Sequence, residues 1–250
     1  MTFVAVPSLP MSDTTRRAWK DAGGIFPRRT RSSAEIVSLA IDSRADFILN
    51  LGRSSFNWGA TTETEVGFIW NKGTNIYDLL WPGNTRRMFN DLMPEQPTSF
   101  PSDVWVKTPG YGGRGKYRTN VQQSLVLPEQ WDWQRHVTGT EYRLVTVGER
   151  VVQQFRRYGE NGNREYRWTR SEELPRGLRT VARNAASRVP GRNVVAWDLI
   201  VPTEPSAGHS DGNVVRPLLF EGNTCPGVNI ATAERIVREI LRQKEELNAN

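Results

Sequence analysis

Two carboxylates and one amide toward the carboxyl end of the sequence each follow a run of apolar residues. Asp198 ends the run VVAWD, Glu221 ends PLLFE, and Asn223 follows two residues later. Side chains two residues apart on a strand share a face, so Glu221 and Asn223 point the same way, and a hairpin would bring Asp198 beside them. Magnesium prefers carboxylate and amide oxygens, and two ions could share Glu221. Because an unpaired charge is costly to bury, this grouping favours a metal site over ordinary strand-end carboxylates.

A glycine-rich segment with basic residues at both ends is a second candidate for binding an anion. It reads KTPGYGGRGK and runs from Lys107 to Lys116. The backbone N–H groups of such a loop can close over phosphates, with the basic side chains beside them. Taken alone the segment is a weak indication, because glycine-rich turns between strands are more often plain hairpin connections.

The charge of the chain indicates an anionic partner. The sequence has 250 residues and a formal net charge of +6, and arginine far outnumbers lysine. Forked guanidinium groups suit phosphates and carboxylates, but the charge balance does not separate a nucleotide, an acidic peptide and a nucleic acid. One cysteine and two histidines exclude an internal disulfide and a multi-cysteine zinc site, so any metal should be bound by oxygen.

Nothing in the sequence predicts a membrane segment or a secretory signal. The mean hydropathy is -0.56, and no apolar run approaches the roughly 18 residues that a membrane-spanning helix needs. The first residues lack the basic and then apolar order of a secretory signal. We therefore expect a cytoplasmic protein without a membrane partner.

Short strands and helices are expected to alternate in the first third of the chain. Apolar runs predict the strands, and amphipathic patterns predict the helices. The expected elements lie at 3–6, 14–22, 34–44, 47–51 and 66–70. They would form an abbreviated α/β lobe ahead of the candidate sites.

The rest of the chain is expected to position the two candidate sites. Asn84 is predicted to cap a helix over 85–93, after which Pro94, Pro97 and Pro101 enforce an extended connection. Further elements are expected as strands at 104–107, 194–201 and 218–221, a hairpin at 139–155, and helices at 175–187 and 232–247. The first of these strands would enter the glycine-rich segment, and the last two would carry the carboxylates.

The order of these segments resembles the ATP-grasp superfamily. VWVK, the glycine-rich segment, QRHVTGTEYRLVTV, VVAWDLIV and LLFEGNTCPGVN follow one another as in its carboxylate-amine ligases, over roughly residues 84–245. The sequence is most similar to the D-alanyl-D-alanine ligases and to the ligase that adds glutamates to a ribosomal protein. The most specific piece, residues 221–227, is similar to the family's E-x-N-x-x-P-G. The short front lobe and the arginine- and tryptophan-rich texture resemble small phage-encoded members.

The resemblance implies an α/β (α+β) chain with the ATP-grasp fold. Two α+β subdomains would sandwich ATP, preceded by the abbreviated α/β lobe at 1–83. The ATP-grasp domain would span 84–250. Its small subdomain, 84–133, would contain the glycine-rich segment, and its large subdomain, 134–250, the metal site.

The resemblance also implies which residues bind ATP. Lys107 would contact the α- and β-phosphates, and Glu141 would accept hydrogen bonds from the ribose hydroxyls. The loop over the β- and γ-phosphates would comprise Gly110, Tyr111, Gly112, Gly113, Arg114 and Gly115. The adenine hinge would comprise Gln134, Arg135, His136 and Val137.

Metal ligands and catalytic cations are implied by the same resemblance. Asp198, Glu221 and Asn223 match the ligands of one or two Mg²⁺ ions, with Mn²⁺ as a substitute. Arg157 and Arg167 match positions at which related ligases place cations beside the transferring phosphate and the acceptor.

Two features depart from the family pattern. The usual Lys-Pro dipeptide is Lys-Thr-Pro here, at 107–109. The family's earlier nucleotide-binding lysine has no clear counterpart, and Arg86 or Arg87 is the candidate to replace it. The substrate lobe is short and matches no family pattern, so the acceptor is not identified.

The implied activity is an ATP-dependent ligation. A carboxylate would be activated as an acyl phosphate and joined to an amine, with ADP and phosphate as products. The short front lobe and the excess of arginine favour a peptide, protein or other macromolecular acceptor over free amino acids, although a homodimer could also complete the pocket. Two alternatives stay open: an ATP-grasp kinase or phosphotransferase, and a non-catalytic basic nucleic-acid-binding protein on a degenerate ATP-grasp fold.

Overall fold

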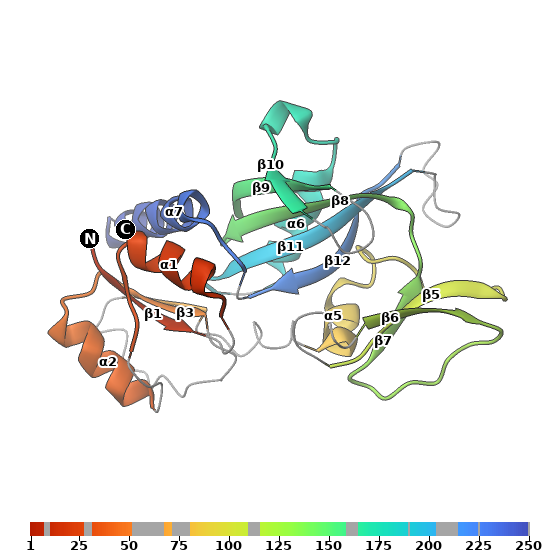
Figure 1. Cartoon of the computed structure of the whole chain (residues 1–250), viewed down its shortest axis with the longest axis horizontal. Helices are drawn as coiled ribbons and strands as arrows, with labels where there is room; N and C mark the ends of the chain where they lie inside the picture. The colour runs from red at the N-terminus through yellow and green to blue at the C-terminus, as the bar shows by residue number, and fades with distance from the viewer. Residues whose placement is uncertain are drawn as a thin grey trace.

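Three β-sheets make up the described part of the chain. The computed structural model describes residues 1–7, 11–27, 32–51, 68–71, 81–109, 116–158, 165–189, 191–203, 215–224 and 226–249. The sheets have four, five and three strands. Figure 1 shows the four-stranded sheet at one end of the molecule, the three-stranded sheet at the other end, and the five-stranded sheet between them. Within the described ranges, no helix is both long and apolar enough to cross a membrane.

The four-stranded sheet confirms the expected α/β architecture at the start of the chain. Its strands are parallel, in the order β2-β1-β3-β4. Parallel neighbours need crossover connections, and α1 and α2 belong to the first two of them. The elements are β1 (Phe3–Pro7), α1 (Asp13–Asp21), β2 (Gly24–Ile25), α2 (Ser33–Asp42), β3 (Ile48–Leu51) and β4 (Ile69–Trp70).

Serine side chains begin both helices of this sheet. The Ser12 hydroxyl accepts from the backbone N–H of Thr15 at 3.2 Å, and the Ser32 hydroxyl accepts from that of Glu35 at 3.3 Å. Each bond satisfies one of the N–H groups that the first turn of a helix leaves unpaired. The helices expected from the sequence are confirmed, with small shifts at their ends.

The five-stranded sheet is antiparallel and has the order β10-β9-β8-β11-β12. The expected hairpin is confirmed as β8 and β9, with Gly148 at φ 55° in its turn. The final strand is longer than expected and includes Asn223. The strands are β8 (Gly139–Val147), β9 (Arg150–Tyr158), β10 (Glu165–Trp168), β11 (Val194–Pro202) and β12 (Leu218–Asn223).

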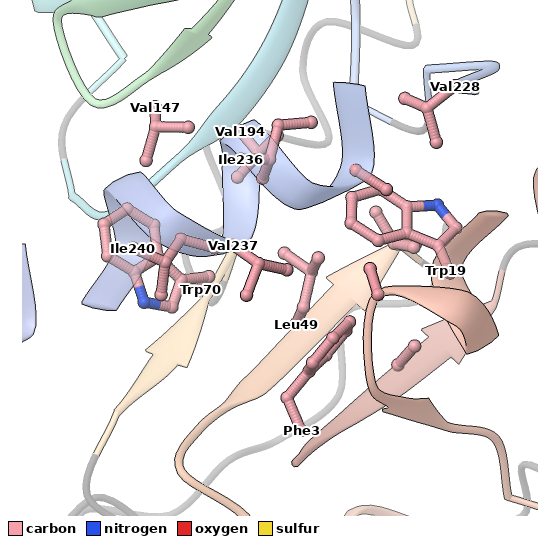
Figure 2. Packing of buried hydrophobic residues seen from close by; sticks show 14 of the residues in the cluster. Phe3, Trp19, Leu49, Trp70, Val147, Val194, Val228, Ile236, Val237 and Ile240 are labelled. Atoms are coloured by element: carbon pink, nitrogen blue, oxygen red, sulfur yellow. The ribbon is translucent and has the colours of Figure 1, made fainter. Parts of the chain in front are cut away.

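Both faces of this sheet are covered, which explains the near-continuous apolar run of β11. One face packs against α6 (Leu178–Ser187) through Val195, Trp197 and Leu199. On the other face, Val194 and Ala196 pack with α7 (Ile230–Asn248) and the four-stranded sheet (Figure 2). Each fully buried aliphatic side chain contributes roughly 1.5–3 kcal/mol relative to exposure. The next position on this second face is Asp198.

The three-stranded sheet has one apolar and one polar face. Its order is β6-β5-β7, and its strands are β5 (Ser102–Lys107), β6 (Lys116–Val121) and β7 (Asp132–Arg135). Val104, Val106 and Trp133 form a cluster on the apolar face. The alternate positions place Lys107 opposite Asp132, and Trp105 opposite Gln134. This polar face meets β12, because Lys107 bonds to the Phe220 carbonyl.

The start of the helix before this sheet corrects a sequence prediction. We expected Asn84 to cap a helix over 85–93, but α5 runs from Pro82 to Phe89 and begins after Trp81. The proline ring fixes the backbone angle that a first helical residue needs and lacks the N–H that a cap would satisfy. Asn84 therefore lies inside the helix. The proposed division of the chain after residue 83 remains a prediction.

Candidate active site

The two candidate carboxylates meet across one register position. β11 and β12 are antiparallel, and Asp198 pairs directly with Glu221. The side-chain amide of Asn223 donates to Asp198 at 3.1 Å and to Glu221 at 3.3 Å. The structure thus brings the three residues together on one face, as the hairpin argument expected. Their role as metal ligands remains a prediction.

A β-bulge lies beside this pair. The register shifts after Asp198, so that Leu199 pairs with Leu219 and Phe220 has no partner in the ladder. The Phe220 carbonyl instead accepts from Nζ of Lys107 at 2.8 Å. The bulge therefore connects the five-stranded sheet to the polar face of the three-stranded sheet.

Both carboxylates are paired with cations that the sequence alone does not assign to the metal site. Arg143 donates to the two Asp198 oxygens at 2.6 and 2.8 Å. Lys116, from the first position of β6, forms an ion pair with Glu221. Arg143 lies two residues after Glu141 on β8 and thus on the same face. That spacing was the only signal in the sequence that could have indicated it.

Burial and pairing set the charges of the two carboxylates. Burial opposes ionisation of Glu221, yet Lys116 and Lys107 hold its pKa at about 2. Burial raises the pKa of Asp198, and Arg143 opposes this effect. Glu221 is therefore an anion throughout the neutral pH range.

The donor set fits a hard divalent cation. Two carboxylates and one amide converge on one face, which suits Mg²⁺ or Mn²⁺ with further oxygens from a phosphate or water. Among the described residues, no point gathers three or more His, Cys, Asp or Glu side chains. The third protein ligand would accordingly be the Asn223 amide, turned so that its oxygen faces the ion.

Lys107 is buried between the two sheets. Its Nζ donates to Oε1 of Gln134 at 2.9 Å as well as to the Phe220 carbonyl. Burial lowers the pKa of Lys107 to about 8, although Asp132 and Glu221 oppose this shift. Both hydrogen-bond acceptors are neutral oxygens, so an anionic oxygen entering here would be a stronger partner than either.

The candidates for a replaced nucleotide lysine both have other partners. Arg86 is buried and makes a two-bond ion pair with Asp132, at 2.9 and 3.1 Å. It also donates to the Pro94 carbonyl at 2.8 Å. Arg87 forms an exposed pair with Glu129. Arg86 thus fastens α5 to the three-stranded sheet, and Arg87 lies on the surface.

A second cationic group lies on the same face of the five-stranded sheet. Arg157 forms an ion pair with Glu141, while its Nε is buried and has no hydrogen-bond partner among the described residues. Tyr166 lies between two guanidinium groups. Its ring centre is 4.4 Å from Cζ of Arg143 and 5.4 Å from Cζ of Arg157. Its hydroxyl is 3.4 Å from Asp198. Burial raises the pKa of Tyr166 to about 12, so its hydroxyl stays protonated.

Tyr166 is expected to hold the two guanidinium groups in place. Replacing it by leucine removes both cation–π contacts and should lower the free energy of unfolding by about 1 kcal/mol. We also expect slower turnover, because Arg143 and Arg157 lose their common support. The matched control is Tyr158→Leu, since Tyr158 contacts Arg156 and Arg167 at 5.0 and 5.3 Å. Equal turnover in the two variants would contradict this role.

The structure separates the two predicted catalytic arginines. Arg157 pairs with Tyr166 across β9 and β10, so both lie on the face of Asp198. Arg167 pairs with Arg156 instead, contacts the Tyr158 ring, and binds Glu165 at 3.0 Å. It is exposed on the opposite face. The geometry thus does not bring Arg167 to the cluster, and we leave it out of the proposed site.

The predicted adenine hinge connects the last strand of the three-stranded sheet to β8. Gln134 is buried and binds Lys107, whereas the backbone N–H groups of Arg135 and His136 bond to Glu95 and Asp103. Nδ1 of His136 accepts from the Trp105 indole at 3.0 Å, and burial lowers the pKa of His136. Val137 is half-buried and continues toward β8.

The predicted phosphate loop falls outside the described residues. Its members are Gly110, Tyr111, Gly112, Gly113, Arg114 and Gly115. The strands on either side of it, β5 and β6, are described and pair with each other. They place Lys107 and Lys116 directly opposite one another, next to β12.

Comparison with solved structures identifies the fold of this chain as the ATP-grasp fold. No protein-family model and no curated protein matches the sequence. A D-alanine–D-alanine ligase from Bacillus anthracis matches with a TM-score of 0.57 at 12% identity, over 98% of this chain and 99% of the ligase. The ATP-grasp ligase PsnB, solved with a minimal precursor, matches with a TM-score of 0.53 at 11% identity, over 96% and 99%. A biotin carboxylase from Campylobacter jejuni, solved as a β-γ-ATP complex, matches at 0.61 and 14%, over 98% and 71%.

Proposed function

We propose, from the ATP-grasp fold of this chain, that it is an ATP-dependent ligase joining a carboxylate to an amine. One observation carries the proposal. From the three-stranded sheet, Lys107 bonds to the Phe220 carbonyl and Lys116 pairs with Glu221. Both contacts lie on β12, beside the group formed by Asp198, Glu221 and Asn223. The two lysines, which could bind phosphate, therefore lie next to the oxygen atoms that could bind a metal. Both groups lie between the two sheets that would enclose a nucleotide.

The proposed roles follow from this placement. Lys107 would hold phosphate oxygens, Glu141 would accept from the ribose hydroxyls, and the segment 134–137 would border the adenine. Asp198, Glu221 and Asn223 would hold Mg²⁺, which would neutralise phosphate charge and polarise the transferred group. Arg143, which orients Asp198, would face the same phosphate charge. Arg157 would bind an anionic substrate group through its Nε, which no other described residue engages.

In the proposed reaction, a carboxylate oxygen of the substrate attacks the γ-phosphorus of ATP and ADP leaves. The acyl phosphate then reacts with an amine, which attacks the carbonyl carbon, loses a proton and expels inorganic phosphate. These steps need no protein nucleophile. The protein would contribute positioning and charge stabilisation from Arg143, Arg157 and Lys107.

Acceptor-dependent release of ADP tests this function. Purified protein, ATP and Mg²⁺ would be incubated with candidate carboxylates and amines, singly and in pairs, and the products identified by mass. A ligase forms stable product only when both substrates are present. Phosphate transfer to a hydroxyl would indicate a kinase instead. Nucleic-acid binding with steep salt dependence and no ATP turnover would indicate the non-catalytic alternative.

For the acceptor, we propose a peptide or protein. The support is the short N-terminal sheet, the net charge of +6 and the fold likeness to PsnB, which was solved with a minimal precursor. A bound chain could itself exclude water from the acyl phosphate. The test is mass addition to peptides, proteins or DNA supplied with ATP and labelled amino acids. Efficient joining of free amino acids or small metabolites alone, with no addition to any polymer, would rule the proposal out.

Replacing Lys107 by methionine should weaken ATP binding about 10-fold, because the ammonium is lost and the apolar stem is kept. The free energy of unfolding should change by no more than about 1 kcal/mol, since a buried charge is removed together with its bonds to two neutral oxygens. Calorimetric titration with a non-hydrolysable ATP analogue measures the first quantity, and urea unfolding measures the second. Unchanged nucleotide affinity would make Lys107 a structural residue.

Nucleotide binding should weaken as the pH rises through about 8, the pKa of Lys107 in the free protein. Phosphate oxygens favour the ammonium form, so they raise this pKa in the complex, and binding takes up a proton near that pH. In the free protein the pKa lies below its ordinary value of 10.5, so this group makes the fold more stable as pH rises from about 8 to 10.5. Calorimetry in buffers of different ionisation heat detects the proton uptake. The variant Lys107→Met should lack it.

A further inference from the structure

The residue that follows β4 joins the four-stranded sheet to both strands of the candidate metal site. Asn71 is buried, with 1% of its surface exposed. Its backbone N–H donates to the Arg192 carbonyl at 2.7 Å, and its side-chain oxygen accepts from Val194 N–H at 2.7 Å. Its side-chain amide donates, over longer distances, to the carbonyls of Val194 at 3.4 Å and Thr224 at 3.5 Å.

Asn71 has a backbone conformation that glycine would adopt more easily. Its φ angle is 59°, in the left-handed region that residues with a Cβ disfavour. Asparagine is tolerated there better than most residues, but glycine would adopt the same φ without that cost. The backbone alone therefore does not explain the side chain. An asparagine is explained by its buried side chain, whose oxygen and nitrogen both form hydrogen bonds.

The two residues that bond to the Asn71 side chain, Val194 and Thr224, are close in sequence to the candidate metal ligands. Val194 begins β11, and Asp198 follows four residues later on the same face, about 13 Å along the strand. Thr224 directly follows Asn223, whose amide contacts both carboxylates. Asn71 thus sets where the edge of the four-stranded sheet lies relative to the start of β11 and the end of β12.

On its other side, Asn71 continues into the four-stranded sheet. Asn50 of β3 donates to the Asn71 carbonyl at 3.4 Å. Trp70 packs in one hydrophobic cluster with Val194 and Ile240, which Figure 2 shows. Asn50 and Asn71 lie at the carboxyl ends of parallel strands, which is the edge where α/β sheets bind ligands.

We propose that Asn71 is a positioning residue that fixes this edge of the four-stranded sheet relative to Asn223 and Asp198. An acceptor bound at the edge would then meet the activated carboxylate in a reactive orientation. The inference rests on the proposed ligase function. Asn71 serves the joining step and not nucleotide binding, because none of its contacts among the described residues reaches the three-stranded sheet.

The test compares the wild-type protein with Asn71→Gly, Asn71→Asp and the control Arg44→Gly. Arg44 is the other non-glycine residue of the described chain with positive φ, at 50°, and it is exposed after α2. Glycine at 71 keeps the backbone conformation and loses the side-chain bonds. Aspartate at 71 keeps an oxygen for the Val194 N–H but, as a carboxylate, cannot donate to Thr224. Three quantities are measured well below the unfolding temperature: kcat with saturating acceptor, the nucleotide dissociation constant, and hydrogen exchange at the Val194 amide.

We expect Asn71→Gly to lower kcat by at least about 10-fold, because misplacement alone has effects of this size. Nucleotide affinity should stay within about twofold, and the Val194 amide should exchange faster. In Asn71→Asp that amide should stay protected while kcat is still reduced, and Arg44→Gly should match the wild type in every measurement.

Two results would overturn the proposal. One is normal kcat in both Asn71 variants, which would make the contacts purely structural. The other is an equal loss of nucleotide affinity and kcat. If Asn71→Gly does not fold, Asn71→Asp alone decides between these outcomes. Absence of acceptor-dependent ADP release in the wild type would instead refute the ligase function itself, which keeps the two failures distinct.

Discussion

Replacement of Glu221 by glutamine is expected to lower turnover by about 100-fold or more, since even residues that only support metal ligands cost 10–100-fold when changed. Glutamine removes one negative charge from a site in which Glu221 pairs with Asp198 in register and faces Lys116. The pKa of Glu221 is held at about 2, so the wild-type group is charged at every pH used for assay. Because glutamine has no ionisable group, no change of pH can restore this charge in the variant.

The Glu221→Gln protein should nevertheless stay folded. The side chains of Lys116 and Glu221 are 34% and 29% exposed, so solvent screens this pair, and its contribution is about 1 kcal/mol, less than the lowered pKa alone would imply. Glutamine also keeps an oxygen that can accept from Asn223. Because the folded pKa lies below the ordinary 4.5, the stabilisation from this charge is present above about pH 4.5 and is lost toward about pH 2. The wild type and the variant should accordingly converge in stability in acid.

Glu239→Gln is the matched control for this substitution. Glu239 is a buried glutamate on α7 that binds Arg242 at 2.6 Å and Gln243 at 2.9 Å. Its loss should lower the free energy of unfolding by about 1 kcal/mol, with turnover unchanged below the unfolding temperature. If Glu221→Gln turned over at the wild-type rate with saturating magnesium, Glu221 would not be a metal ligand.

The carboxylate group was predictable because its signals are local. Apolar residues before Asp198 and Glu221 indicate strands, and the two-residue spacing to Asn223 fixes a common face. The hairpin β8–β9 was predictable for the same reason, since alternation continues on both sides of Gly148. Each of these signals lies within a few neighbouring residues and can be read without knowing how the strands pair.

The cations around the carboxylates were missed because cross-strand register determines their place. Arg143 belongs to the site because it lies opposite Asp198, and Tyr166 because it lies opposite Arg157. A one-residue slip would exchange Arg167 for Tyr166. The strands β6, β7 and β10 read KYRTNV, DWQR and EYRW, which are short and polar, and nothing in such segments fixes a register.

Removal of Arg143 is expected to have the second large effect. Arg143 and Asp198 form a two-bond ion pair whose side chains are 20% and 13% exposed. Breaking such a pair from one side leaves a buried charge without its partner, so Arg143→Met should lower the free energy of unfolding by about 3 kcal/mol. Turnover should fall as well, because Asp198 loses its orientation and the phosphate loses a cation.

A double variant separates these two consequences. Replacing both partners, as Arg143→Met with Asp198→Leu, removes the unpaired charge, and exchanges of this kind are often neutral for stability. We expect the double variant to regain most of the lost stability, to within about 1 kcal/mol of the wild type, and to remain inactive. Urea unfolding and acceptor-dependent ADP release measure the two properties on the same preparations.

Comparison of Arg143→Met with the double variant decides whether the pair of Arg143 and Asp198 serves catalysis or only the stability of the fold. Stability that returns without turnover means that Asp198 and Arg143 are present for chemistry, because the fold tolerates an apolar pair in their place. Turnover that returns with stability would mean that the pair only supports the sheet and that the metal site lies elsewhere. If Arg143→Met unfolds as readily as the wild type, the pair contributes nothing to the fold, and the contact between Tyr166 and Arg143 loses its proposed purpose. The tyrosine variant then supplies an independent check, because Tyr166→Leu leaves both charges of the pair in place and removes only the support of the guanidinium group.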